Sequence, residues 1–406
     1  MEHRKVVLML IPNLNFGGAQ RVFYNLSVEL TRHYHVVECV FNLDAGHVFK
    51  SGNEVLSLDV PAGKTFPSKF YNFLLRCRRL KKIKHALKPD ICISHLEGAD
   101  LVNILSGGAG KTVTWVHGSK AHDENISGFL GFLRHKLLIP LTYNKADAVV
   151  TVSKAIKQEL VTFYGVPENK IKPIHNFFDI HQIVQKSLHP LSTGELTIFE
   201  KSPVLVFSGR LVTQKNPFAL LSWFAGFRKV CTCKLVIVGD GELYPQLLRL
   251  SNELGLKAYS AKDNLPIHEH YDLYFLGFQD NPFKFIKHAT LFILPSSWEG
   301  FPMVLGEAMA CGVPVASADC PTGPREMLTD DNMSQLQTSD FFAEHGVLLP
   351  LLNENTFPVW TETLCRLLTD KTMLQKYADR TTERARHFSK DENVHLVTEL
   401  IESIVS

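Results

Sequence analysis

The stretch LFILPSSWEGFPMVLGEAMACGVPVA, residues 291–316, decides the fold class of this chain. It opens with a short apolar run, residues 291–294, that predicts a buried strand, and a loop follows. A helix is expected from about Pro302 to Gly312, because proline suits the first turn of a helix and glycine suits its end. A second strand is expected at residues 313–316. Strand, helix and strand in this order predict a parallel sheet with a helical crossover.

The same alternation extends in both directions from this stretch. The expected strands are residues 6–11, 36–41, 91–95, 112–117 and 148–152, then 204–208, 234–238, 274–276, 291–294 and 313–316. The alternation falters in the polar stretch 176–203. The sequence therefore predicts two doubly wound α/β domains, residues 1–185 and 204–375, joined by a linker at 186–203. A terminal helix, residues 376–406, is expected to cross back towards the first domain.

The composition narrows the class of protein. The 406 residues suffice for two or three domains, and the formal net charge is only +2. Residues 1–175 carry 23 basic and 14 acidic side chains, whereas residues 176–406 carry 20 and 27. Eight scattered cysteines predict a reduced, cytoplasmic protein without disulfides or zinc. No signal peptide is expected, and no apolar run reaches the ~18 residues of a membrane span.

Glycines and cations gather where strands of the predicted sheets end, the place where open α/β sheets bind ligands. Gly17 and Gly18 follow the first strand, and glycine lets backbone amides approach an anion; a tight turn is the alternative. Gly209 is followed by Arg210 and, five residues later, Lys215. These two cations suit a diphosphate, although an isolated pair is as often a solvated surface feature.

Two nucleotide motifs are absent. No G-x-G-x-x-G fingerprint follows a strand, which argues against NAD. The string GGAGKT at residues 107–112 lacks the glycine spacing of a P-loop and runs into a strand instead of a helix, so nucleoside triphosphate hydrolysis is not expected. The remaining candidate site residues are two glutamates. Glu299 stands at a strand end and Glu307 lies eight residues later, so both are placed to face one ligand across a helix N-terminus.

In its strand–loop–helix–strand context, this string resembles the E-x7-E signature of the retaining GT-B glycosyltransferases of family four. The resemblance covers nearly the whole chain, through residues 17–19, 209–210 with 215, 239–242, 277–278, 299–307 and 320–326. It implies two Rossmann-like domains that face each other across an interdomain cleft. It also implies transfer of a hexose or N-acetylhexosamine from a nucleotide sugar, with no metal and no other cofactor. The absence of a D-x-D motif agrees with a metal-independent enzyme.

The resemblance implies roles for individual residues. Arg210 and Lys215 would neutralise the diphosphate and the charge on the leaving nucleotide, and Glu299 would hold donor-sugar hydroxyls. His117 ends a strand of the first domain and matches the active-site histidine of the family. The implied catalytic residues are Glu299, His117, Arg210 and Lys215. The implied donor-binding residues are Gly17, Gly18, Gly209, Arg210, Lys215, Glu299, Gly300, Phe301, Pro302, Met303 and Glu307, with Gly323 and Glu326 shaping the pocket.

Glu307 is expected to accept hydrogen bonds from ribose hydroxyls. Phe16 and Gln20 are expected to tune the choice of acceptor. The family often has Glu where this chain has Gln20, which removes a charge beside the glycine loop.

The expected substrates are a UDP-sugar and a growing surface-polysaccharide or lipid-linked acceptor. A basic helix at residues 76–87 suggests contact with anionic membrane, although it also fits a solvated surface, and no motif indicates nucleic acid. Two alternatives stay open. One is a GT-B enzyme that acts on a small soluble acceptor, and the other is a non-catalytic nucleotide-sugar-binding protein.

Overall fold

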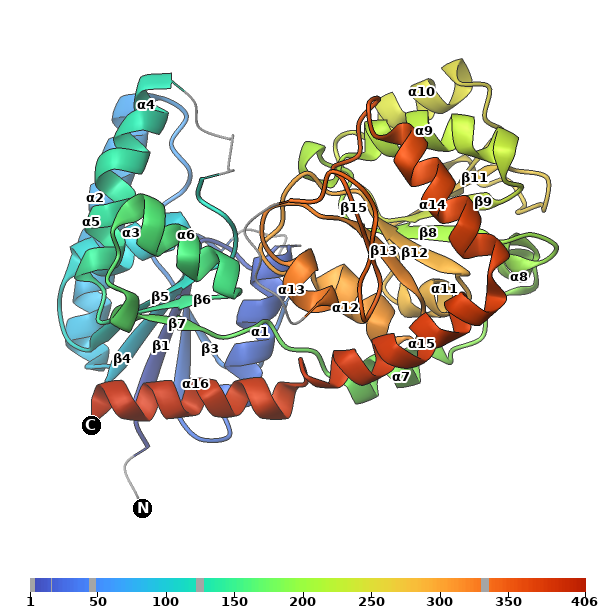
Figure 1. The fold of residues 1–406 in the computed structure, drawn as a ribbon. Coiled ribbons are helices and arrows are strands. Elements are labelled where there is room, and N and C mark those ends of the chain that lie inside the picture. The colour runs from blue at the N-terminus through green and yellow to red at the C-terminus, as the bar shows by residue number, and fades with distance from the viewer. Residues whose placement is uncertain (1–3, 16, 44–48, 122–127, 330–335) are drawn as a thin grey trace. The chain divides into compact units, whose positions relative to one another are not determined.

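The computed structural model describes residues 4–15, 17–43, 49–121, 128–329 and 336–406. The chain forms two compact units, one of residues 1–177 and 391–406 and the other of residues 178–390. Each unit contains one sheet with helices on both of its faces (Figure 1). The prediction of two doubly wound α/β domains is therefore confirmed.

The first unit is built on a parallel sheet. Its strands are β1 (Val6–Ile11), β2 (His35–Val40), β3 (Glu54–Ser57), β4 (Ile91–His95), β5 (Lys111–Val116), β6 (Ala148–Thr151) and β7 (Ile171–Pro173). They lie in the order β3-β2-β1-β4-β5-β6-β7. The helices are α1 (Gly18–Leu30), α2 (Phe66–Leu87), α3 (Glu97–Ser106), α4 (Gly128–Leu133), the π-helical turn η1 (Arg134–Leu138), α5 (Ile139–Lys145), α6 (Lys154–Tyr164), the 3₁₀ turn η2 (Glu168–Lys170) and α16 (Lys390–Val405). The strand order reverses between β1 and β4, which places the ligand-binding edge of this sheet there.

The second unit repeats this plan. Its strands are β8 (Val204–Ser208), β9 (Lys234–Val238), β10 (Ala258–Ser260), β11 (Leu273–Gly277), β12 (Leu291–Leu294), β13 (Val315–Ala318), β14 (Phe341–Phe342) and β15 (Val347–Leu349). They lie in the order β10-β11-β9-β8-β12-β13-β15-β14, and β14 alone among these runs antiparallel to its neighbour. The order reverses between β8 and β12, the two strands that precede the predicted cationic and carboxylic loops.

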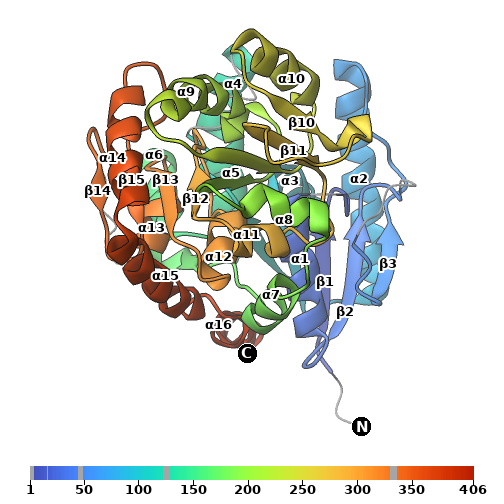
Figure 2. The same ribbon diagram turned by 90° about the vertical axis from the view of Figure 1, so that its right-hand side faces the viewer.

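Helices cover both faces of this second sheet. They are α7 (Ile180–Ser187), α8 (Thr193–Phe199), η3 (Thr213–Lys215), α9 (Pro217–Val230), α10 (Tyr244–Glu253), η4 (Ala261–Asp263), α11 (Phe283–Lys287), α12 (Met303–Ala310), α13 (Pro324–Leu328), α14 (Phe357–Thr369) and α15 (Lys371–Arg386). Figure 2 shows α9 and α10 beyond one face of the sheet and α11 and α12 beyond the other. The central strands are buried on both faces, which explains why they are continuous apolar runs in the sequence.

The boundaries of the two units along the chain differ from those expected. Residues 186–203, expected as a linker, contain α8 and belong to the second unit, where Ser192 and Glu195 form a capping box that begins this helix. The terminal segment is two helices, α15 and α16, instead of one. The break between them holds Phe388, which is buried against Phe301 and bonded through its carbonyl to the amide of Phe178 at 2.9 Å. Burial of this phenylalanine explains why the helix is interrupted there.

The last helix, α16, packs within the first unit from Asp391 onward. Val397 and Ile401 are buried on its inner face. Glu402 pairs with Lys5 next to β1 and accepts a hydrogen bond of 2.9 Å from the hydroxyl of Tyr34. The first unit therefore includes a helix that is distant from it in sequence.

Candidate active site

A buried ion pair lies at the strand-order reversal of the second sheet. Lys215, in the turn η3 after β8, places Nζ 2.5 Å from Oε1 of Glu299, in the loop after β12. Glu299 is only 5% exposed. The two residues are 84 positions apart in the chain and come together because β8 and β12 are neighbouring parallel strands. The structure thus pairs Lys215 directly with Glu299, two residues for which the sequence predicted separate roles in one site.

The loop after β8 is fixed by close contact with the loop after β9. The amide of Gly209 donates to the carbonyl of Val238 at 3.0 Å, and the amide of Leu211 donates to that of Asp240 at 3.0 Å. Gly239 has a φ of 146°, and a side chain there would meet the carbonyl oxygen of Gly209 at 2.0 Å. Gly239 must therefore be glycine for the cationic loop to take this path.

Arg210 differs from Lys215 in its surroundings. Its side chain is exposed, and it makes no ion pair with any residue in the described ranges. A guanidinium in water keeps its freedom to reach a bidentate anion, so Arg210 can meet a ligand without breaking an internal bond.

The loop that carries Glu299 is anchored at several points. The amide of Ser297 donates to the carbonyl of Gln214 at 2.9 Å, and the Gln214 side chain donates back to the carbonyl of Trp298 at 2.8 Å. The amide of Glu299 donates to the carbonyl of Pro321 at 3.3 Å, and Thr322 donates through its hydroxyl to the carbonyl of Glu299. These bonds hold the carboxylate in place before any ligand binds.

The helix α12 begins directly after this loop, at Met303, with Pro302 as its N-cap residue. Its N-terminus carries the partial positive charge of the helix dipole, so the backbone from Gly300 to Met303 suits a phosphate or a sugar oxygen. The side chain of Phe301 points elsewhere, since it is buried against Phe178 and Phe388 with ring centroids 6.4 and 5.1 Å away. Only the backbone of Phe301 can therefore serve the predicted donor site.

Glu307 lies on α12 and is 2% exposed. Burial, together with the charge of Glu307, raises the pKa of the neighbouring Cys311 thiol to about 12. The loop of residues 320–326 closes against the carboxylate loop. At Gly323, with a φ of 90°, an added side chain would meet Pro302 at 2.7 Å. Glu326 is buried on α13, close to the buried ion pair of Asp319 with Arg325.

The glycine loop of the first unit is covered by a side chain of α1. Gly17 has an extended backbone, but a Cβ there would meet Oε1 of Gln20 at 2.1 Å. The amide nitrogen of Gln20 donates to Oδ1 of Asn13 at 3.2 Å. The side chain of Gln20 therefore packs on Gly17 and bonds to Asn13. The glutamine that replaces the glutamate common in the family thus has a structural role here. Phe16 lies outside the described residues.

His117 follows β5 and is half-buried at the carboxyl edge of the first sheet. Burial and the nearby charge of Lys120 lower the pKa of His117 to about 3, so the ring is neutral at physiological pH. Its Nε2 lies 2.8 Å from Nδ1 of His95, the last residue of the neighbouring strand β4. Sequence reasoning missed His95, although the signal was present: the expected strands 91–95 and 112–117 each end at a histidine, and parallel neighbours share an edge.

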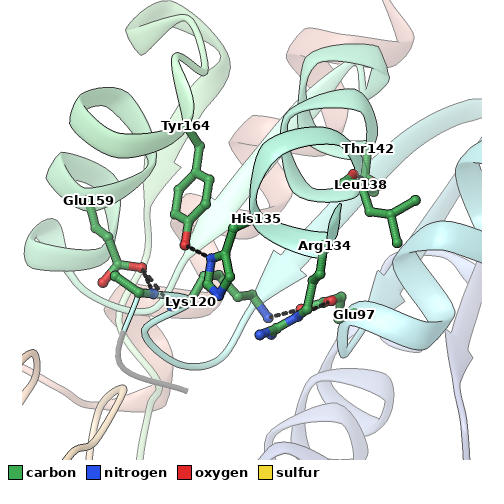
Figure 3. A network of polar contacts seen from close by, with 9 residues as sticks. Glu97, Lys120, Arg134, His135, Leu138, Thr142, Glu159 and Tyr164 are labelled. Carbon is green, nitrogen blue, oxygen red and sulfur yellow. Dashed lines mark hydrogen bonds and ion pairs between the residues drawn. The ribbon is translucent and has the colours of Figure 1, made fainter. Parts of the chain in front are cut away.

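The loop after His117 is held by a network of charged groups (Figure 3). Glu97 accepts from Nε and from a terminal nitrogen of Arg134 at 2.6 and 2.7 Å, and Lys120 lies 3.3 Å from the same carboxylate. Glu159 accepts from the backbone amide of Lys120 at 2.6 Å and from the hydroxyl of Ser119 at 2.5 Å. Burial raises the pKa of Glu97, but the bonds from Arg134 and Lys120 outweigh burial and leave it below its ordinary value. The network fixes the backbone on which His117 depends.

Two family models match the chain. The model described as Glycosyltransferase Family 4 matches residues 16–182, and the model described as Glycosyl transferases group 1 matches residues 192–337. An uncharacterized glycosyltransferase of Methanocaldococcus jannaschii is 28% identical over 82% of this chain and 84% of its own length. An N-acetylgalactosamine-N,N'-diacetylbacillosaminyl-diphospho-undecaprenol 4-alpha-N-acetylgalactosaminyltransferase of Campylobacter jejuni is 31% identical over 64% of this chain and 60% of its own length.

The fold has solved neighbours. The structure of Anabaena HepE in complex with UDP and glucose matches with a TM-score of 0.72 at 18% identity, over 99% of this chain and all of its own. Together with the two sheets, these matches define a glycosyltransferase of GT-B fold. The chain belongs to glycosyltransferase family 4, as its motifs predicted.

No group of three or more His, Cys, Asp or Glu side chains in the described ranges is arranged to hold a metal ion. Among the helices of the same ranges, none has the length and apolar character needed to cross a membrane.

Proposed function

We propose that this chain is a retaining, metal-independent glycosyltransferase that moves a hexose or N-acetylhexosamine from a UDP-sugar to a surface-polysaccharide, lipopolysaccharide or other lipid-linked glycan acceptor. The observation that carries the proposal is the buried Lys215–Glu299 pair at the strand-order reversal of the second sheet, with Arg210 exposed beside it and the N-terminus of α12 next to it. Cations and a carboxylate in one loop cluster suit a molecule that has a diphosphate at one end and hydroxyls at the other.

The reaction needs stabilisation of negative charge on the departing nucleoside diphosphate. Lys215 stabilises that negative charge with a fixed ammonium, and Arg210 stabilises it with a mobile guanidinium. This stabilisation acts on the charge that develops on the leaving group in the transition state. Glu299 is oriented by Lys215 and accepts hydrogen bonds from donor-sugar hydroxyls. Glu307 accepts from the ribose hydroxyls. Retention is read from the anomeric configuration of the product, and an inverted product would contradict it.

The donor is tested by a thermal-shift panel of UDP-, GDP- and ADP-sugars. UDP comes first because the Anabaena structure of the same fold holds UDP and glucose. A ligand present at 100 times its dissociation constant stabilises the folded state by about 2.7 kcal/mol, which raises Tm by roughly 5–10 °C for a unit of this size. We expect the shift with the UDP-sugar alone. A shift with only another base would overturn the UDP assignment, and no shift with any would overturn the donor site.

The acceptor proposal is supported by a relative and by a surface. The name of the Campylobacter jejuni relative specifies an acceptor on diphospho-undecaprenol, a lipid. In this chain, α2 presents exposed apolar side chains in its first half and exposed cations in its second half. We propose that α2 brings the enzyme to the cytoplasmic surface of an anionic membrane, where a lipid-linked acceptor would reside. An enzyme for a small soluble acceptor would have no need of this surface.

Chelation is expected to leave transfer unchanged. Arg210 and Lys215 supply positive charge at the predicted diphosphate position, so the leaving group has cationic partners without a divalent ion. The initial rate is measured with purified enzyme in excess EDTA and compared with the rate in added magnesium or manganese. Loss of activity in EDTA that either metal restores would contradict the metal-independent mechanism.

A further inference from the structure

Two histidines at the carboxyl edge of the first sheet share one hydrogen bond. Nδ1 of His95 and Nε2 of His117 are 2.8 Å apart, and their ring centroids are separated by 5.0 Å. This bond occupies the Nε2 side of His117. Nδ1 is consequently the ring nitrogen of His117 that is left for a substrate.

The ring of His95 is held by packing on two sides. It stacks on Trp115 with centroids 5.1 Å apart and an interplanar angle of 11°, and it meets Phe23 edge to face at 5.2 Å. Its exposed fraction is 0%. A ring held in this way keeps its nitrogens in fixed directions, so it can impose an orientation on the ring to which it is bonded.

The position of the shared proton follows from the surroundings of His95. Burial lowers the pKa of both rings, so both are neutral and one must donate while the other accepts. If His117 donated, the proton of His95 would lie on Nε2, which is buried and has no hydrogen-bond partner among the described residues. A buried N–H without an acceptor is costly and is rarer than an unsatisfied acceptor. The favoured arrangement therefore has His95 donating from Nδ1.

We infer that His95 is a positioning residue that fixes His117 as the Nδ1–H tautomer, so that His117 presents an N–H donor to an oxygen of the transferred sugar. The tautomer follows from the contacts and the burial of the two rings, whereas its use towards a sugar rests on the proposed function. In this state His117 donates a hydrogen bond. It does not remove a proton from the acceptor hydroxyl, because the nitrogen without a proton faces His95.

The tautomer is measured directly by long-range proton–nitrogen NMR correlation on the full chain labelled with ¹⁵N in histidine. His117→Gln and His95→Phe identify the two rings by loss of their signals. The expected result without substrate is a protonated Nδ1 and a bare Nε2 on both rings. A proton on Nε2 of either ring, or a charged ring, would overturn the inference. This measurement needs no folded variant beyond the two that identify the signals, and the wild-type spectrum decides it.

Two variants of His95 separate positioning from simple packing. His95→Phe preserves the stacking on Trp115 but removes the donor, whereas His95→Asn keeps an amide N–H close to the place of Nδ1. We expect the Phe variant to move His117 towards the Nε2–H form and to lower kcat about tenfold, the effect of one lost hydrogen bond, with KM for the donor unchanged. The Asn variant should retain the tautomer and most of kcat.

The matched control is His135→Phe. His135 also bonds through Nδ1, at 2.7 Å from the hydroxyl of Tyr164, and also stacks on its partner. Its loss should leave the tautomer of His117 unchanged. If His95→Phe leaves His117 in the Nδ1–H form, the positioning role is wrong. If the tautomer is as expected but no nucleotide sugar binds in the thermal-shift panel, the proposed function fails while the tautomer assignment stands.

Discussion

Alanine at Arg210 or at Lys215 is expected to lower kcat by about 10²–10³, the usual loss when one stabiliser of transition-state charge is removed. Both variants remove a cation that stabilises the leaving group, but they differ in their effect on the stability of the fold. Arg210 is exposed, whereas Lys215 is paired with the buried Glu299. Arg210→Ala should leave Tm unchanged. It is therefore the cleaner test of the diphosphate role.

Lys215→Ala has a second effect, because it leaves the carboxylate of Glu299 buried without its cation. Breaking a buried pair destabilises more than replacing both partners. The double variant Lys215→Met with Glu299→Gln removes both charges at nearly constant volume. It should regain the stability lost in Lys215→Ala but none of the activity.

Activity is measured at saturating donor, with Tm recorded for each variant. The matched control is Lys201→Ala, which removes a lysine from the exposed pair with Glu269 in the same unit. It should change neither quantity. Near-native rates for both Arg210→Ala and Lys215→Ala would show that the diphosphate is bound elsewhere.

Much of the fold could be predicted from the sequence because its signals are local. Parallel strands buried on both faces must be continuous apolar runs, and β1, β8, β9 and β12 are each followed directly by a glycine or a proline. The break between α15 and α16 could not be predicted in the same way. It depends on Phe388 being buried against Phe178 and Phe301, which are far away in the sequence.

The candidate site likewise combines features that the local sequence predicts with features that depend on residues far apart in the chain. The strand-end positions of Gly209, Lys215 and Glu299 follow from periodicity, and their membership of one site followed from a family motif. Their direct pairing needed the order of strands in the sheet, since β8 must lie beside β12 for Lys215 to reach Glu299. Burial also changed the interpretation of Phe301, because an aromatic residue inside a motif cannot be assigned to a ligand or to the core from sequence alone.

The basic segment at residues 76–87 changes most when the structure is considered. Lys84 is buried and donates to Asn103, while Arg79 donates to the carbonyls of Leu58 and Asp59. The cations of α2 left exposed to solvent include Arg78, Lys81 and Lys82. Exposed apolar side chains lie on the same side of α2 as these cations, because residues three or four apart share a face of a helix. They are Phe66, Phe70 and Leu74. Sequence alone could not separate cations that satisfy the fold from cations that face outward.

Glutamine at Arg78, Lys81 and Lys82 together is expected to weaken binding to anionic vesicles about a hundredfold. Each cation near an anionic surface contributes about 1 kcal/mol, and about 1.4 kcal/mol corresponds to a factor of ten. Binding is measured by co-sedimentation with phosphatidylcholine vesicles that contain phosphatidylglycerol. The parent protein should also lose affinity as salt is added, because the Debye length at physiological ionic strength is only about 8 Å.

The control for net charge is glutamine at Lys371, Lys376 and Arg386, three exposed cations of α15 in the second unit. Serine at Phe66, Phe70 and Leu74 tests the apolar half of α2, and the binding that this variant loses should be the part that resists salt. Transfer to a water-soluble acceptor analogue should survive in every variant, because these residues are outside the strand-end loops. If the α15 control loses as much binding as the α2 cation variant, general charge and not α2 attracts the membrane. If the α2 variants bind like the parent, α2 is a solvated surface, and the lipid-linked acceptor is then supported only by the relative from Campylobacter jejuni.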